Sequence, residues 1–319
     1  MKPLRLALIG VGHMGRFHAE KLAALAREDA GVEQAVLVDR HLDRARAGGD
    51  ALGVRALSDA RDAFAAADAV IVAVPTAAHA ELVAAALEAG LDVLVEKPIA
   101  TTLAEAEALV ALASARGRVL QVGHLEWFIA AMRTVAARAT RPRFFEGHRL
   151  GPFPARSLDI DVVLDLMIHD VDIVQRLVGA EPLRVEALGV PVLTERADIA
   201  NARLVFANGC VANLTASRVS PKPLRKLRFF QHDAYFSIDF QEPSVVIGQR
   251  GAPNERGERS VALEKIQIDR EDALANQLRA FVQGVRERRA VAGDGDQGLA
   301  ALRTALRIVA AMPPEGELA

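Results

Sequence analysis

The opening of the chain contains the pattern that most constrains its fold. An apolar run, Leu4 to Ile9, leads directly into Gly10-Val11-Gly12-His13-Met14-Gly15, and a helical stretch follows. In such a strand, turn and helix, the first glycine permits the tight turn and the second lets a ligand approach the backbone. The third glycine allows the helix to pack closely against the strand. The pattern predicts a dinucleotide-binding unit with a pyrophosphate at the helix N-terminus.

The alternation of strands and helices continues to residue 122. Short apolar runs rich in β-branched residues alternate with alanine-rich helical stretches, as a parallel sheet with crossover helices requires. The predicted strands are Leu4 to Ile9, Gln34 to Val38, Ala69 to Val74, Asp92 to Glu96 and Val119 to Val122, and the clearest helices are His79 to Ala89 and Leu103 to Arg116. Residues 1–122 are therefore predicted to form a Rossmann domain with a doubly wound α/β sheet.

Residues 123–296 show the pattern of a second, α+β domain with a large, mostly antiparallel open sheet. A strong helix from Asp165 to Val178 precedes a long stretch that is typical of strands. Within it, Asn208-Gly209 predicts a two-residue type I′ hairpin turn, and His232-Asp233 indicates a second hairpin. The final helix, 297–311, is expected to pack back on the first domain.

The second domain offers few helices to cover its sheet. Besides Asp165 to Val178, the only other long helix in this half is predicted for residues 272–288. Because each face of a sheet that carries apolar side chains needs cover, one face is expected to meet another subunit. The sequence thus favours a homodimer or homotetramer formed through the C-terminal sheet.

Composition excludes several classes of partner. The 319 residues carry a formal net charge of -2 with acidic and basic residues interspersed, so no basic stripe favours nucleic acid. The apolar runs are too short for a signal peptide or a membrane span, which predicts a cytoplasmic protein without a membrane partner. The single cysteine, Cys210, lies in an apolar alternating run, and the eight histidines lack the paired spacing of zinc sites, so no metal is expected.

Asp39 indicates the kind of dinucleotide. It follows Gly15 by 24 residues and ends the second predicted strand, where a carboxylate can accept hydrogen bonds from the ribose hydroxyls of adenosine. The carboxylate repels a 2′-phosphate, which favours NAD over NADP. Arg40 could instead stack on adenine or reach a phosphate, so NADP is the alternative. A helix cap or turn is the purely structural alternative for Asp39.

Two further groups of residues are candidates for catalysis. Glu96-Lys97-Pro98 lies at the carboxyl end of a predicted strand, the edge at which open α/β sheets bind ligands, so Lys97 is directed toward a cleft. On the helix of the second half, Asp165 and His169 are four residues apart and share one face. A carboxylate in that position can orient an imidazole and increase its basicity for proton abstraction.

Taken together, these motifs closely resemble the glucose-fructose oxidoreductase, inositol dehydrogenase and MocA family over nearly the whole chain. The matching residues are Gly10, Gly12, Gly15, Asp39, Pro75-Thr76 with His79, Glu96-Lys97-Pro98 and Asp165 to Asp170. The resemblance implies that Lys97 lies near the reacting hydroxyl and the nicotinamide, that His169 is the general base and that Asp165 assists it. It also implies cofactor contacts by Pro75, Thr76, His79 and Glu96, in addition to the glycines and Asp39, and it implies that Val95 to Pro98 contacts the nicotinamide end. His13 and Met14 of the glycine loop and Arg40 beside Asp39 are further candidates for cofactor contact.

Within that family, two segments are most similar to enzymes that oxidise the 3-hydroxyl of UDP-N-acetylglucosamine. They are residues 121–126 and 161–170, and such enzymes prepare a 3-keto sugar for transamination toward 2,3-diamino lipid A. The resemblance implies substrate contacts at His124 and Glu126. Arg149 and Arg156 are further candidates for substrate contact, and they lie in the segment that replaces the glycine-rich lead-in common before the catalytic helix. The two arginines could bind a diphosphate, although solvated loop arginines are an equal alternative.

The sequence also departs from the family pattern and leaves other functions open. Trp127-Phe128-Ile129-Ala130 stands where relatives commonly have Arg-Phe-Asn-Pro, which removes polar groups. Alternative substrates are a free polyol or sugar or a UDP-sugar uronate, and the reverse reduction of a ketone or imine is also open. A cofactor-binding regulator without catalysis is disfavoured, because Lys97, Asp165 and His169 are all retained.

Overall fold

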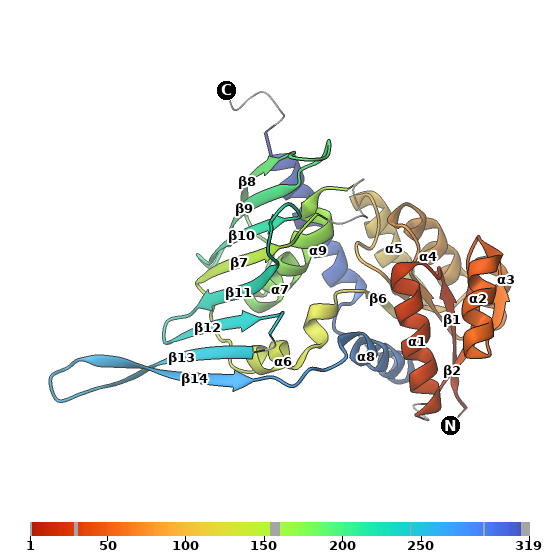
Figure 1. The fold of residues 1–319 in the computed structure, drawn as a ribbon, viewed down its shortest axis with the longest axis horizontal. Helices are drawn as coiled ribbons and strands as arrows, with labels where there is room; N and C mark the ends of the chain where they lie inside the picture. The colour runs from red at the N-terminus through yellow and green to blue at the C-terminus, as the bar shows by residue number, and fades with distance from the viewer. Residues whose placement is uncertain (1, 29–30, 154–159, 243, 290, 314–319) are drawn as a thin grey trace. The chain divides into compact units, whose positions relative to one another are not determined.

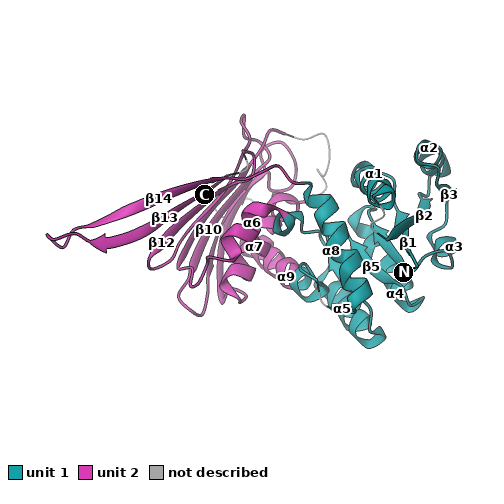
Figure 2. Ribbon diagram, turned by 90° about the horizontal axis from the view of Figure 1, so that it is seen from below, with its two compact units in different colours: residues 1–128, 272–299 teal, residues 129–271, 300–319 magenta. Residues whose placement is uncertain are grey.

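The computed structural model describes residues 2–28, 31–153, 160–242, 244–289 and 291–313. The chain divides into two compact units, which are coloured separately in Figure 2. Unit 1 comprises residues 1–128 and 272–299, and unit 2 comprises residues 129–271 and 300–319. Each unit has its own sheet and its own core.

Unit 1 contains the predicted doubly wound sheet. Its strands lie in the order β3-β2-β1-β4-β5-β6, and all neighbours are parallel (Figure 1). The strand order reverses beside β1, which is the place where open α/β sheets bind ligands at their carboxyl edge. The strands are β1 Leu4–Ile9, β2 Val32–Val38, β3 Arg55–Leu57, β4 Ala69–Val72, β5 Asp92–Val95 and β6 Leu120–Val122. The five predicted strands are confirmed, and β3 is too short to have been recognised from its pattern.

The helices of unit 1 follow the predicted alternation. They are α1 His13–Arg27, α2 Leu42–Leu52, α3 Ala60–Phe64, η1 Thr76–Ala78, α4 His79–Glu88, α5 Leu103–Arg116, η2 Leu125–Phe128 and α8 Ala273–Glu287. Helix α5 starts with a capping box between Thr102 and Glu105 and ends at Gly117, whose φ of +60° suits glycine.

The position of helix α8 differs from the predicted domain boundaries. It was expected in residues 123–296, apart from residues 1–122, but it belongs to unit 1. Its fully buried Leu278 and Phe281 lie in the same core as Leu22 of α1. The amphipathic pattern identified the helix correctly, but it did not show which sheet the apolar face would cover.

Unit 2 contains the predicted large, mostly antiparallel sheet. The order is β14-β13-β12-β11-β7-β10-β9-β8, and only the β7–β10 pair among these is parallel. The strands are β7 Phe144–Leu150, β8 Arg184–Val190, β9 Ile199–Val205, β10 Val211–Ser217, β11 Leu224–Phe230, β12 Ala234–Asp239, β13 Ser244–Pro253 and β14 Arg259–Gln267. The β13–β14 hairpin extends well past the ends of the other strands (Figure 1).

Both predicted hairpins are present, but the first has a different turn. Strands β9 and β10 are joined through Phe206 to Cys210, and the carbonyl of Phe206 accepts the N–H of Gly209 at 3.0 Å. Gly209 has a φ of +78°, whereas Asn208 keeps a negative φ and its side chain accepts the N–H of Cys210. A type I′ turn requires positive φ at both central residues, so that prediction was wrong. The loop is longer, and glycine alone takes the left-handed position.

The helices of unit 2 lie along one face of its sheet (Figure 2). They are α6 Ala130–Ala136, the π-helical turn η3 Val163–Met167, α7 Ile168–Val178 and most of α9 Gly295–Ala311. Helix α9 was predicted to pack on the first domain, but from Ala300 onward it belongs to unit 2, where Thr304 accepts a hydrogen bond from Gln175 of α7 at 3.0 Å. None of the helices in the described ranges is long and apolar enough to cross a membrane.

A fully buried ion pair fixes the segment that leads into η3. Arg218 donates to Asp198 at 2.8 Å and to the carbonyl of Ile160 at 2.8 Å. Asp198 also accepts the backbone N–H groups of Val192, Leu193 and Thr194. Burial raises the pKa of the Asp198 carboxyl, but these donors outweigh it and hold the pKa well below its usual value. The buried charges are therefore paired, and the start of the helical segment is anchored to the sheet.

Candidate active site

The glycine loop in unit 1 has the close contacts that its sequence predicted. Gly10 has a φ of +94°, and a Cβ there would lie 2.4 Å from the carbonyl oxygen of Ala73. A Cβ on Gly15 would lie 1.9 Å from the carbonyl oxygen of Gly10. Gly12 is the N-cap of α1, and nothing lies within 4 Å of where its Cβ would be. Two glycines are thus required by the protein itself, whereas the third leaves open space at a helix N-terminus.

Asp39 is tied to this loop by its carboxylate. One oxygen accepts the N–H of Val11 at 3.0 Å, and the other accepts the N–H of His41 at 2.9 Å. The side chain is at the end of β2 and only 8% of the residue is exposed. The contact with His41 is the kind that a carboxylate makes in a turn, which was the purely structural alternative for Asp39. The contact with Val11 places the carboxylate beside the loop, where a ribose contact was predicted.

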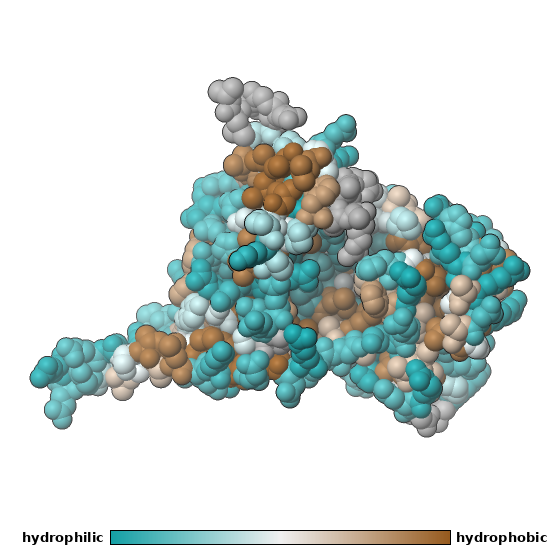
Figure 3. All heavy atoms as spheres, in the orientation of Figure 1, coloured by the Kyte–Doolittle hydropathy of each residue, from teal (hydrophilic) through white to brown (hydrophobic). Residues whose placement is uncertain are grey.

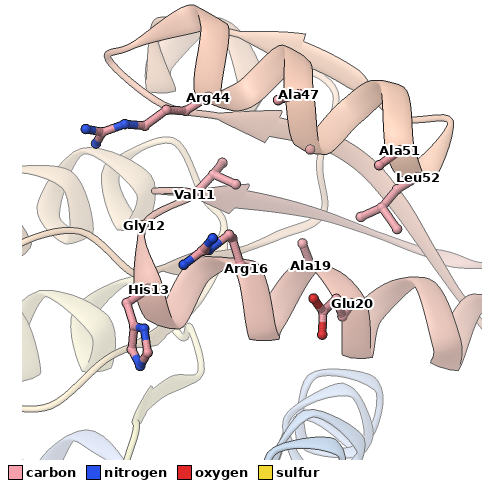
Figure 4. Close-up of a pocket in the computed structure, with 11 residues that line it drawn as sticks. Val11, Gly12, His13, Arg16, Ala19, Glu20, Arg44, Ala47, Ala51 and Leu52 are labelled. Carbon is pink, nitrogen blue, oxygen red and sulfur yellow. The ribbon is translucent and has the colours of Figure 1, made fainter.

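A cavity of about 690 Å³ begins at the same loop and runs between α1 and α2 (Figure 4). Its walls are mainly apolar, and Arg16 of α1 and Arg44 of α2 extend toward the end where Gly12 and His13 lie. Two guanidinium groups beside a helix N-terminus make that end favourable for an anion.

The Glu96-Lys97-Pro98 segment begins directly after β5, as predicted, but Glu96 does not face a ligand. Its carboxylate turns inward and lies 2.7 Å from Nε2 of His18, which is fully buried on α1. Burial raises the pKa of Glu96, but the contact with His18 and the charges of Lys97 and His79 outweigh it and lower the pKa. Glu96 is therefore a buried anion whose carboxylate contacts the protein itself, and its cofactor contact stays a prediction.

His79 connects the loop that follows β4 with the loop that follows β5. Its Nδ1 lies 2.8 Å from the carbonyl oxygen of Pro98, and its Nε2 lies 3.0 Å from that of Val74. Burial lowers its pKa, although both carbonyls and Glu96 act in the opposite direction. Only 1% of the residue is exposed, so His79 has a structural role, and its cofactor contact stays a prediction.

In unit 2, the predicted Asp165 and His169 lie where a π-helical turn passes into an α-helix. Asp165 is within η3, and the N–H of Ile168 bonds to the carbonyl of Val163, five residues earlier. His169 is in the first turn of α7, and both side chains belong to half-buried residues. Single π turns inside helices occur frequently at functional sites, because they change the direction in which side chains project. The sequence showed the spacing of these residues but not this turn.

Next to His169, Asp170 forms a buried ion pair with Arg149 of β7. The guanidinium donates to both carboxylate oxygens, at 3.2 and 2.8 Å, and both side chains are 4% exposed. The guanidinium also lies 5.6 Å from the centre of the Phe240 ring. Diphosphate binding and a solvated loop position were equal alternatives for Arg149. The side chain is buried, so it is not a solvated arginine, and diphosphate binding stays a prediction. The second predicted arginine, Arg156, lies outside the described residues.

Comparison with known proteins agrees with this architecture. Residues 4–124 match the model of the oxidoreductase family with an NAD-binding Rossmann fold, and residues 129–237 match the GFO/IDH/MocA C-terminal domain. The chain belongs to the Gfo/Idh/MocA oxidoreductase family. It is 40% identical to UDP-N-acetylglucosamine 3-dehydrogenase of Acidithiobacillus ferrooxidans, over 96% of each chain. A structure of that enzyme superposes with a TM-score of 0.90 and covers 98% of both chains.

More distant members of the family share the fold. The chain is 28% identical to scyllo-inositol 2-dehydrogenase (NAD(+)) of Bacillus subtilis, over 77% of this chain and 74% of that enzyme. The structure of scyllo-inositol dehydrogenase from Lactobacillus casei, with bound NAD(H) and scyllo-inositol, has a TM-score of 0.80 at 19% identity and covers 98% and 97% of the two chains. The chain is thus a member of a family of NAD-binding dehydrogenases.

The remaining predicted residues of this family member are distributed as follows. His13, Arg40 and Pro75 are exposed, and Met14, Thr76, Lys97 and Glu126 are half-buried, and their ligand contacts stay predictions. His124 is only 1% exposed, and its substrate contact stays a prediction. Within the described ranges, no three His, Cys, Asp or Glu side chains are grouped so that they could hold a metal ion.

Sequence analysis missed His18, although a signal for it exists. On α1 the buried residues are Gly15, His18, Ala19, Leu22 and Leu25, which is an apolar helical face interrupted by one histidine. A lone polar side chain at such a position must find a partner inside, because an unpaired buried polar group is costly.

The ion pair of Arg149 and Asp170 predicts a distinctive stability pattern. Arg149→Met should lower the free energy of unfolding by about 3 to 5 kcal/mol, because it leaves the Asp170 charge buried without its partner. The double variant with Asp170→Leu should recover much of that loss, since no charge is then buried. Denaturant unfolding of the native protein, the two single variants and the double variant measures the effect. A double variant that loses as much as the sum of both single changes would contradict it.

Proposed function

We propose that this chain is an NAD-dependent dehydrogenase that oxidises the 3-hydroxyl of UDP-N-acetylglucosamine. The observation that carries the proposal is the likeness to the Acidithiobacillus enzyme of that name, which extends over nearly the full length of both chains at 40% identity. The presence of Lys97, Asp165 and His169 supports catalysis over a purely regulatory role. The 3-keto product would be a substrate for an aminotransferase, which fits the predicted route toward 2,3-diamino lipid A, and we propose that the enzyme works in the cytoplasm.

The residues of unit 1 fit the cofactor that the family binds. The N–H groups at the start of α1, next to the open side of Gly12, would hold the diphosphate, and Asp39 would accept hydrogen bonds from the ribose hydroxyls. Arg16 adds positive charge at the same end of α1. These contacts favour NAD, because the Asp39 carboxylate would repel the 2′-phosphate of NADP.

The chemistry divides into removal of a hydride and removal of a proton. NAD, when bound, supplies the hydride acceptor. We assign acceptance of the hydroxyl proton to an imidazole nitrogen of His169, with Asp165 orienting the ring. We assign to Lys97 a hydrogen bond to the substrate oxygen as negative charge develops there.

The substrate assignment predicts a strong dependence on the nucleotide. With NAD present, formation of NADH should proceed with UDP-N-acetylglucosamine at a kcat/KM about 100-fold or more above that for free N-acetylglucosamine, because contacts with the remote nucleotide contribute to catalysis. An aminotransferase and an amino donor should be added to consume the keto product. The panel includes the UDP-sugar uronate and inositol. Turnover with inositol or free sugar alone would reject the nucleotide-sugar assignment.

The catalytic assignment predicts that Lys97→Ala and His169→Ala each reduce kcat by about 100-fold or more. NAD affinity and thermal stability should change little, since neither residue is part of a buried core. Steady-state rates at saturating substrate and NAD titrations measure both effects. Lys2→Ala and His232→Ala, which alter exposed residues, are the matched controls. A variant that stays within a few-fold of the native rate would remove its residue from the mechanism.

We also propose that two copies of the chain associate through the face of the unit 2 sheet opposite α7. The strand registers place one row of side chains across the whole sheet on that face. The row consists of Leu263, Gly248, Tyr235, Phe230, Phe144, Val211, Val205 and Arg184. Phe230 is 40% exposed and Leu263 is 71% exposed.

Apolar residues extend this surface at both ends of the sheet. Leu188 and Val190 of β8 alternate with half-buried positions and are 43% and 42% exposed. Figure 3 shows hydrophobic side chains gathered over β8 and along the β13–β14 arm. Exposed apolar residues gathered in this way are characteristic of association sites. A second copy is the occupant that we favour, because an isologous contact buries the same row on both chains.

The association predicts that Phe230→Arg reduces the mass of the particle. The native protein should have at least twice the chain mass of 34.1 kDa by light scattering, and the variant should dissociate, because a charge is introduced into the apolar row. Phe17→Arg is the control, since Phe17 of α1 is 43% exposed but lies in unit 1. A monomeric native protein, or a variant that keeps the native mass, would reject this surface.

A further inference from the structure

His18 is the residue whose placement the cofactor loop and the catalytic assignments leave unexplained. It is 0% exposed, although an imidazole is costly to bury without a reason. Its Nε2 lies 2.7 Å from Glu96, and in the described part of the chain its Nδ1 has no hydrogen-bond partner. Because a carboxylate only accepts hydrogen bonds, the proton must be on Nε2. In the described part of the chain, the imidazole therefore makes one hydrogen bond, to Glu96.

Glu96 has little freedom to move away from that contact. Its backbone N–H donates to the carbonyl of Val72 in the neighbouring strand at 2.9 Å. On its other side, a Cβ on Gly123 would lie 2.8 Å from a carboxylate oxygen and 3.1 Å from the Cα of Glu96, so glycine leaves just enough room for this side chain. The carboxylate is thus packed between α1 and the end of β6, with His18 as its hydrogen-bond donor.

Lys97 is consequently held from both sides. The preceding residue is fixed through the Glu96 side chain by His18, and the following Pro98 has its carbonyl within hydrogen-bond distance of His79. The charges that face Glu96 are those of His18 from α1, His79 from α4 and the adjacent Lys97. The two buried histidines therefore bracket the lysine segment.

We propose that His18 is a positioning residue, which acts through Glu96 to hold Lys97 in its reactive place. The proposal rests on the catalytic role given to Lys97 under the proposed function. It also explains why this histidine is on α1, since the same helix carries the cofactor loop at its N-terminus. One rigid helix thereby fixes both the cofactor loop and the lysine segment, so their positions relative to each other within unit 1 stay constant.

The test compares two amide replacements of His18. In His18→Gln the amide nitrogen occupies roughly the place of Nε2 and can still donate to Glu96, whereas in His18→Asn the side chain is too short to reach. We expect His18→Asn to lower kcat by about 10- to 100-fold, because small displacements of a reacting group have effects of that size. KM for NAD should change by less than about 3-fold, and His18→Gln should restore kcat to within about 3-fold of native.

A general loss of stability must be separated from a loss of positioning. Leu22→Ala is the matched control, because Leu22 lies one turn further along the same buried face of α1 and has no polar contact. It should lower the melting temperature at least as much as His18→Asn, while kcat stays near native. If kcat falls equally in Leu22→Ala, or if His18→Gln is as slow as His18→Asn, the positioning role is rejected.

The Lys97→Ala background distinguishes failure of this inference from failure of the proposed function. If His18 acts through Lys97, adding His18→Asn to Lys97→Ala should lower kcat by less than about 2-fold more, because the two changes remove the same contribution. An equal loss in both backgrounds would reject the link between the residues. If Lys97→Ala alone is near native, the catalytic role of the lysine fails, and the inference fails with it.

Discussion

A contact between two pieces of backbone determines the geometry of unit 1. The carbonyl oxygen of Gly10 lies where a Cβ of Gly15 would be, at 1.9 Å, so α1 can start against β1 only because neither position carries a side chain. This close approach sets the direction of α1 over the sheet. Once the helix is placed, its N-terminus lies at the open side of Gly12, and His18 on its buried face meets Glu96, directly after β5. The cofactor loop and the lysine segment are therefore consequences of one contact.

The contact between His18 of α1 and Glu96, the residue after β5, is polar where the surrounding core is apolar. Glu96 is kept as an anion by His18, Lys97 and His79, although burial alone would raise its pKa. An arrangement of this type costs desolvation energy, and an apolar pair of similar volume would often be as stable. The polar contact fixes the orientation of the Glu96 side chain, because a hydrogen bond restricts orientation far more than an apolar contact does. Such an arrangement suits a segment that must present a lysine.

Unit 2 uses buried charge in the same way. Arg218 and Asp198 anchor the chain ahead of η3, and Arg149 holds Asp170 beside His169. Each arginine has planar, paired donors that match a carboxylate, so each contact fixes an angle as well as a distance. Between them lies the π-helical turn with Asp165, the part of the helical segment in which the regular hydrogen-bond pattern is interrupted. The two ion pairs thus support both ends of the segment that carries the proposed base.

The sequence by itself determined the order of elements, the glycine loop, Asp39 and the family, because these depend on local patterns: period-two and helical spacing, glycine at a tight turn, and residues at strand ends. The tertiary structure alone decided that α8 covers the first sheet, that Arg149 and Glu96 face inward, and that His18 meets Glu96 across 78 residues of chain. The sequence alone does not show whether the partner of a polar side chain is water, a ligand or a distant carboxylate. Tertiary packing decides which partner it is, because a polar side chain that becomes buried must form a hydrogen bond or ion pair inside the protein.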